Sequence, residues 1–200
     1  MKHIPISLIY ARLLIGLALL ALSLASVSHF PAIAIGLITL GLLTDVFDGI
    51  IARQLNISTE KLRRLDSSVD QVFWGLVVGA TFFSCRQFFS DHGGRLLLLL
   101  AAEALVYAVC YAKFRKEVAT HAWSSKAWVL VSFAALVQVI ATCTSTVLFE
   151  LCFYVGLLSR LENAAILLLL RSWTNDVPTV YHAWLLRQNK PIKRHKLLNG

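Results

Sequence analysis

Long apolar runs separated by short polar segments make up most of the chain. Each run is about 20 residues long, the length that an α-helix needs to cross the hydrocarbon core of a bilayer. Six membrane spans are predicted, over residues 8–28, 31–52, 67–88, 95–112, 127–148 and 161–186. The pattern therefore predicts a single all-α integral membrane domain, residues 1–200, that ends in a basic tail over residues 187–200.

The composition agrees with this pattern. Hydrophobic residues make up 58% of the chain, charged residues make up 15%, and the mean hydropathy is +0.69. A soluble domain is excluded by these values. Residues 1–28 carry Lys2 and Arg12 and could be mistaken for a signal peptide, but the run is long and the next one begins at Pro31.

The basic residues predict the orientation. With the N-terminus inside, most lysines and arginines fall in cytoplasmic segments, whereas the outer side keeps Arg86, Arg95 and Arg160. Both termini are then cytoplasmic in a multi-pass protein of the inner or cell membrane. The net charge of +8 is spread over membrane-flanking loops, where anionic headgroups explain it better than nucleic acid does.

Four aspartates stand at the ends of two apolar segments. They are Asp45, Asp48, Asp66 and Asp70. Within a helix over 31–52 the first two share a face with small residues, and the second two lie one turn apart at the start of the next helix. The two acid pairs are therefore expected to face one another across a short connection, at the cytoplasmic edge of the membrane.

Four neighbouring carboxylates need a counter-charge, because each like-charged pair at about 4 Å costs roughly 4 kcal/mol at an effective dielectric near 20. All-oxygen ligands favour hard divalent cations, and two Mg²⁺ or Mn²⁺ ions about 4 Å apart would form the clamp used for displacement at phosphorus. The alternative is a salt-bridge cluster with Arg53, Arg63 and Arg64.

The acids belong to a longer motif. The pattern resembles the signature of the CDP-alcohol phosphatidyltransferase family, DxxDGxxAR followed by eight residues and GxxxDxxxD. Seven of its eight fixed positions match: Asp45, Asp48, Gly49, Ala52, Arg53, Asp66 and Asp70. Leu62 stands where the family has its second glycine, and Pro5 and Arg12 partly match the family's opening PNxxTxxR.

The resemblance implies an activity: transfer of a phosphatidyl group from CDP-diacylglycerol to an acceptor alcohol with release of CMP. Asp45, Asp48, Asp66 and Asp70 would hold the metals, and Asp70 would also be the general base. The nucleotide would lie along Asp45, Gly49, Ala52, Arg53 and the position of Leu62. The resemblance also implies a homodimer.

A second polar patch, residues 111–128, lies between the fourth and fifth predicted spans. Its basic residues suit a phosphate-bearing acceptor, and Arg115 and Lys126 are the leading candidates to bind it. Glycerol 3-phosphate is the first choice of acceptor, and inositol phosphate, serine and phosphatidylglycerol stay open. Ordinary positive-inside charge is the alternative for most of the patch. Arg171 is a third candidate because the span 161–186 places it inside the membrane. With a span near 151–171 instead, it would be a boundary residue.

Two other functions remain open on the sequence alone. Intramembrane acids would also suit a small cation transporter, and Leu62 leaves room for a catalytically altered binding or scaffold subunit. The four cysteines have no metal-ligand spacing and are interpreted as small buried hydrophobes.

Overall fold

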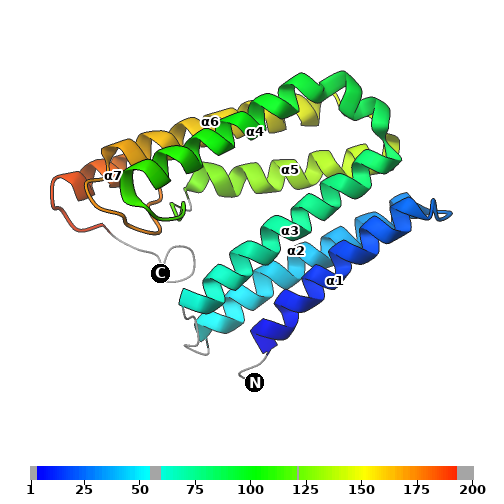
Figure 1. Cartoon of the computed structure of the whole chain (residues 1–200), viewed down its shortest axis with the longest axis horizontal. Helices are drawn as coiled ribbons and strands as arrows, with labels where there is room; N and C mark the ends of the chain where they lie inside the picture. The colour runs from blue at the N-terminus through cyan, green and yellow to red at the C-terminus, as the bar shows by residue number, and fades with distance from the viewer. Residues whose placement is uncertain (1–3, 55–59, 121, 193–200) are drawn as a thin grey trace. The chain divides into compact units, whose positions relative to one another are not determined.

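The computed structural model describes residues 4–54, 60–120 and 122–192, and every regular element within them is an α-helix (Figure 1). The helices are α1 (Ile4–Leu24), α2 (Phe30–Gln54), α3 (Glu60–Ser84), α4 (Arg86–Phe114), α5 (Trp123–Thr142), α6 (Val147–Leu169) and α7 (Val180–Arg187).

Five of these helices, α1, α2, α4, α5 and α6, are long and apolar enough to cross a membrane. The sixth long helix, α3, has charged first turns and an apolar remainder. Large apolar side chains such as Leu14, Leu97 and Leu100 are about two-thirds exposed, as expected where lipid rather than water covers the surface. The predicted all-α integral membrane fold is confirmed.

The sixth predicted span, 161–186, is wrong. The helix in that region is α6, Val147–Leu169, and a loop separates it from the short α7. Arg171 therefore lies beyond the end of α6 and is exposed, which makes it a boundary residue rather than an intramembrane one. Hydropathy misplaces this span because it favours a loop at Arg160, whereas an ion pair allows Arg160 to lie in the middle of α6.

Two other helices begin earlier than hydropathy predicts. Helix α3 begins at Glu60 rather than residue 67, so Asp66 and Asp70 lie inside it rather than at its start. Helix α4 begins at Arg86 rather than residue 95 and continues through Gly93 and Gly94. Hydropathy reports which residues suit lipid. It misses the start of α3, where Glu, Lys, Leu and Arg extend the helix because they are good helix formers.

The chain divides into two compact units. The first comprises residues 1–90 and 137–144, and the second comprises residues 91–136 and 145–200. In the first unit α1 packs against both α2 and α3. Phe73 on α3 is fully buried against Gly41 of α2 and Gly16 of α1, where any larger residue would meet its ring. These small residues allow the three helices to approach closely.

A disulfide joins Cys85, which follows α3, to Cys143, which follows α5, and both residues belong to the first unit. The interpretation of all four cysteines as small buried hydrophobes is therefore wrong for this pair. It is right for Cys110 and Cys152, which are free and buried. The pairing could not be predicted because 58 residues separate the two partners.

In the second unit, polar side chains join α4, α5 and α6. Arg95 and Arg160 pair with Glu150 and Glu103, so two ion pairs link α4 to α6. Ser125 of α5 contacts Ser159 of α6 at 3.0 Å between hydroxyl oxygens. Apolar side chains are as stable in lipid as in the protein interior, so the hydrophobic effect does not hold membrane helices together. Polar contacts between helices, such as these, contribute instead.

Candidate active site

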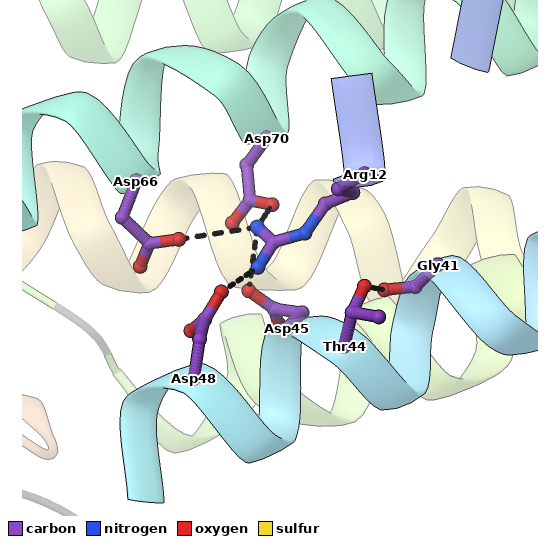
Figure 2. Close-up of polar contacts among 7 residues, drawn as sticks. All are labelled: Arg12, Gly41, Thr44, Asp45, Asp48, Asp66 and Asp70. Atoms are coloured by element: carbon purple, nitrogen blue, oxygen red, sulfur yellow. Dashed lines mark hydrogen bonds and ion pairs between the residues drawn. The ribbon is translucent and has the colours of Figure 1, made fainter. Parts of the chain in front are cut away.

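The four aspartates converge on one point between α1, α2 and α3 (Figure 2). Asp45 and Asp48 project from the second half of α2, and Asp66 and Asp70 project from the first half of α3. Each pair lies about one turn apart along its helix, so each pair shares a face. The predicted meeting of the two acid pairs is confirmed.

Arg12 of α1 lies in the middle of the acids (Figure 2). Its side chain is fully buried, and its guanidinium is paired with all four carboxylates. Nη1 donates hydrogen bonds to Asp66, at 3.1 Å, and to Asp70, while Nη2 donates to Asp48. Asp45 lies 3.0 Å from Nη1 as an ion pair.

The acids differ in exposure. The side chain of Asp48 is 3% exposed, that of Asp45 is 38% exposed, and those of Asp66 and Asp70 are 30% exposed. The cluster is thus closed on the side of Asp48 and open along the other three acids. A ligand can reach the three partly exposed carboxylates without unfolding a helix.

The charge of this group is unbalanced. Four carboxylates share a single guanidinium, so full ionisation would leave three negative charges in excess. The other basic residues that the sequence offers as partners, Arg53, Arg63 and Arg64, have side chains outside the described residues. Concentrated negative charge between packed helices attracts cations strongly, because screening there is weaker than in water.

Three of the acids have the geometry of a metal site. Asp45, Asp48 and Asp66 each offer one oxygen, and these oxygens lie within 4.8 Å of one another. An all-carboxylate set of this kind fits a hard cation such as Mg²⁺ or Mn²⁺. The donor atoms are therefore of the right kind and close enough together for a divalent cation.

The residues predicted to line the nucleotide are only partly described. Gly49, Ala52 and Arg53 belong to α2, one to two turns beyond Asp45, but their side chains lie outside the described residues. Leu62 is partly buried and lies one turn before Asp66 on α3. These positions continue the faces of α2 and α3 that carry the acids.

The predicted acceptor residues, Arg115, Lys126 and Arg171, all belong to the second unit. Lys113 donates hydrogen bonds to the carbonyls of Leu167 and Leu168, at 2.9 and 2.7 Å, which brings the end of α4 to the end of α6. Arg115 follows α4 and stacks on Tyr111, and Arg171 follows α6.

Lys126 lies in the first turn of α5. The backbone N–H of Trp123, at the start of that helix, donates to the carbonyl of Pro178 in the loop after α6. Residues 119 and 120 accept further backbone hydrogen bonds from Asp176 and Val177. The three basic candidates therefore lie at the same end of the second unit.

The central position of Arg12 was not predicted, although the sequence carries a signal for it. Arg12 interrupts an apolar run, and an arginine within a membrane span needs a partner or a cavity. Glu103 and Arg160 carry the same signal in the second unit. A charge inside an apolar run is thus the feature that points to all three residues.

Comparison with known protein families supports the motif. The family model described as CDP-alcohol phosphatidyltransferase matches residues 2–170, which is most of the chain and includes α1 to α6. No curated protein and no solved structure matches the chain significantly.

Proposed function

The chain belongs to the CDP-alcohol phosphatidyltransferase family, and we propose that it transfers a phosphatidyl group from CDP-diacylglycerol to an acceptor alcohol, releasing CMP. The observation that carries this proposal is the meeting of Asp45, Asp48, Asp66 and Asp70 on two neighbouring helices. A binding or scaffold subunit would have no need for four acids that leave three negative charges in excess.

Asp45, Asp48, Asp66 and Asp70 are the proposed metal ligands, for two Mg²⁺ or Mn²⁺ ions. When bound, such ions supply charge neutralisation for the pyrophosphate and for the phosphorus that is attacked. Asp48 is the most buried of the set and gives it a fixed anchor on α2. Asp45 and Asp66 are partly exposed and complete the set from the open side.

Asp70 is the proposed general base. It lies one turn after Asp66 on α3, and its carboxylate is 30% exposed, so an acceptor hydroxyl can reach it. It takes the proton as the hydroxyl oxygen bonds to the phosphorus nearer the lipid. The bond from that phosphorus to the CMP oxygen then breaks, and CMP leaves.

The cytidine nucleotide is proposed to lie along Asp45, Gly49, Ala52 and Arg53 of α2, with Leu62 of α3 opposite. Glycine and alanine permit close approach of a ligand to a helix backbone. Leu62 adds a side chain where the family signature has a glycine, so the nucleotide is expected to lie nearer to α2.

Arg115, Lys126 and Arg171 are proposed to bind the acceptor. Three cations at one end of the second unit suit a phosphorylated alcohol, and glycerol 3-phosphate is the acceptor that we propose. Arginine binds phosphate in a bidentate manner and lysine binds it as a point charge. The protein is also proposed to act as a homodimer, as the family resemblance implies.

The acid cluster is proposed to face the cytoplasm, with both termini on that side. Asp66 and Cys85 lie 19 residues apart on and just after α3, which corresponds to about 28 Å along a helix. Disulfides persist in oxidising compartments, so the Cys85–Cys143 end is expected to face outward. The acids at the other end of α3 then face inward, in agreement with the distribution of lysine and arginine.

This orientation is testable with a maleimide that cannot cross membranes. Sealed right-side-out vesicles should show labelling of the exposed Cys143 only after reduction, and a Cys85→Ser, Cys143→Ser variant provides the background from the two buried free cysteines. Reduction-dependent labelling confined to inverted vesicles would reverse the proposed orientation.

The proposed activity is tested by measuring CMP release from CDP-diacylglycerol by the purified protein in Mg²⁺ or Mn²⁺. A panel of acceptors, with glycerol 3-phosphate first, would identify the alcohol, and the Asp70→Asn variant is the negative control. We expect release that requires both an acceptor and a divalent cation. Silence across the panel, with cations still bound, would favour a different donor or a scaffold role.

A further inference from the structure

We propose that Arg12 is a built-in counter-ion that occupies the acid cluster until a divalent cation displaces its guanidinium, and that it thereby weakens metal binding. This inference rests on the proposed function, because it assumes that the cluster takes a metal. It adds a residue outside the acid motif to the groups that control the site.

The position of Arg12 conflicts with a bound metal. Asp45, Asp48 and Asp66, whose oxygens have the spacing of metal ligands, each already give an oxygen to the guanidinium. Figure 2 shows the guanidinium in the space between these carboxylates. A divalent cation bound to the same three acids would meet the positive charge of Arg12 at close range. Metal and guanidinium therefore compete for the same three carboxylates.

Among the described residues, Arg12 does not satisfy all of its own donors or all of the surrounding acids. Nη1 has two protons, and these go to Asp66 and Asp70, so Asp45 receives no hydrogen bond from it although it lies 3.0 Å away. The Nε proton, in contrast, has no hydrogen-bond partner within the described part of the chain, although that atom is buried. Three acids thus share one nitrogen while another donor is idle.

Charge explains why Arg12 can hold the cluster without satisfying it. An arginine keeps its proton in proteins, so it always supplies one positive charge to the four carboxylates. The three negative charges left over still attract a divalent cation, which brings twice the charge and binds carboxylate oxygens at about 2.1 Å. Arg12 thus stabilises the metal-free protein and lowers its affinity for the metal.

The test compares Mn²⁺ binding, measured from the electron paramagnetic resonance signal of free Mn²⁺, by full-length wild-type protein and by Arg12→Gln, with no lipid substrate present. We expect Arg12→Gln to bind Mn²⁺ at least about ten-fold more tightly, because a positive charge next to the ligands is removed. Arg12→Lys, which keeps the charge, is the matched control and should remain closer to wild type. Equal or weaker binding by Arg12→Gln would overturn the inference.

A thermal melt provides a second readout. Without metal, Arg12→Gln should melt below wild type, and Mn²⁺ should raise its melting temperature more than it raises that of wild type. If Arg12→Gln does not fold without metal, the double variant Arg12→Gln, Asp70→Asn restores the excess of three negative charges. This double variant should fold without metal and bind Mn²⁺ more tightly than Asp70→Asn alone, and failure to do so would overturn the inference.

The same titration separates the two proposals. If wild type binds Mn²⁺ and Arg12→Gln binds it no better, the counter-ion role fails and the proposed metal site stands. If neither protein binds Mn²⁺ at millimolar concentration, the metal site and the proposed function built on it fail together.

Discussion

Among the side chains that the structure describes, each of the two units buries one arginine among its helices, and the two arginines have very different partners. Arg160 in the second unit pairs, among the described residues, with one acid, Glu103, whose Oε2 lies 2.8 Å from its Nε. Its guanidinium also lies 3.7 Å from the centroid of the Trp128 ring, and Nη1 donates to the carbonyl of Gly156. Arg12 in the first unit pairs instead with four acids.

The difference separates a structural ion pair from a reactive cluster. Around Arg160 one positive charge meets one negative charge, and the pair joins α4 to α6 without attracting a further ion. Around Arg12 four carboxylates share one positive charge, so packing alone does not account for the residues chosen there. In a membrane protein an excess of buried charge is a better indicator of function than a buried charge by itself.

Removing one acid from the cluster should have the largest effect. Asp70→Asn is expected to lower turnover about a thousand-fold, because the base that accepts the hydroxyl proton is lost. It should leave much of the CDP-nucleotide binding intact, and the melting temperature should not fall, since the charge excess decreases. CMP release and nucleotide binding by the same preparation are the measurements. Equal loss of both would make Asp70 purely a metal ligand.

Breaking the Arg160–Glu103 ion pair should lower stability and leave the metal site unaffected. Glu103→Gln leaves Arg160 without its counter-charge and is expected to cost about 2 kcal/mol of unfolding free energy, below the value for a fully buried pair since Glu103 is partly exposed. Mn²⁺ affinity should be unchanged. The measurements are denaturant unfolding in detergent and the Mn²⁺ titration.

Two variants serve as controls for Glu103→Gln. Glu162→Gln removes an acid from α6 for which no ion pair is seen among the described residues, and it should be neutral. The double variant Glu103→Gln, Arg160→Met removes both charges and should recover much of the lost stability. A double variant as unstable as Glu103→Gln would show that the pair is not the cause.

A smaller effect is expected where Arg160 and Trp128 pack against Gly156. A Cβ at this position would lie 2.7 Å from Trp128 Nε1 and 2.8 Å from Leu99 Cδ2. Gly156→Ala should therefore cost about 1 kcal/mol through overpacking. Gly36→Ala, where a Cβ would meet nothing within 4 Å, is the matched control. The measurement is the unfolding free energy of both variants. An equal loss of stability in the two would exclude the packing explanation.

Much of the fold was predictable because the membrane imposes simple requirements. The hydropathy of the apolar runs located five of the six long helices, although it shifted several of their ends, and it misplaced α6. The shift at Glu60 arose because charged residues that are good helix formers extend α3 beyond its apolar part. The position of Arg160 within α6 was unpredictable from hydropathy, because only its pairing with Glu103 permits it.

The positions of the four acids could be predicted from the sequence better than the contacts between distant parts of the chain. The spacing of Asp45 with Asp48, and of Asp66 with Asp70, is enough to place each pair on one helical face. The disulfide of Cys85 with Cys143 could not be found in this way, since its partners follow helices far apart in the sequence.

By itself, the sequence determined an all-α membrane protein, its family motif and the facial alignment of the four acids, because hydropathy and helical periodicity are local properties. Only the tertiary structure decided that Arg12 lies among those acids and pairs with all four. That arrangement depends on how closely α3 packs against α1 at Gly16 and against α2 at Gly41. Distances between helices follow from such packing contacts, which local periodicity does not specify.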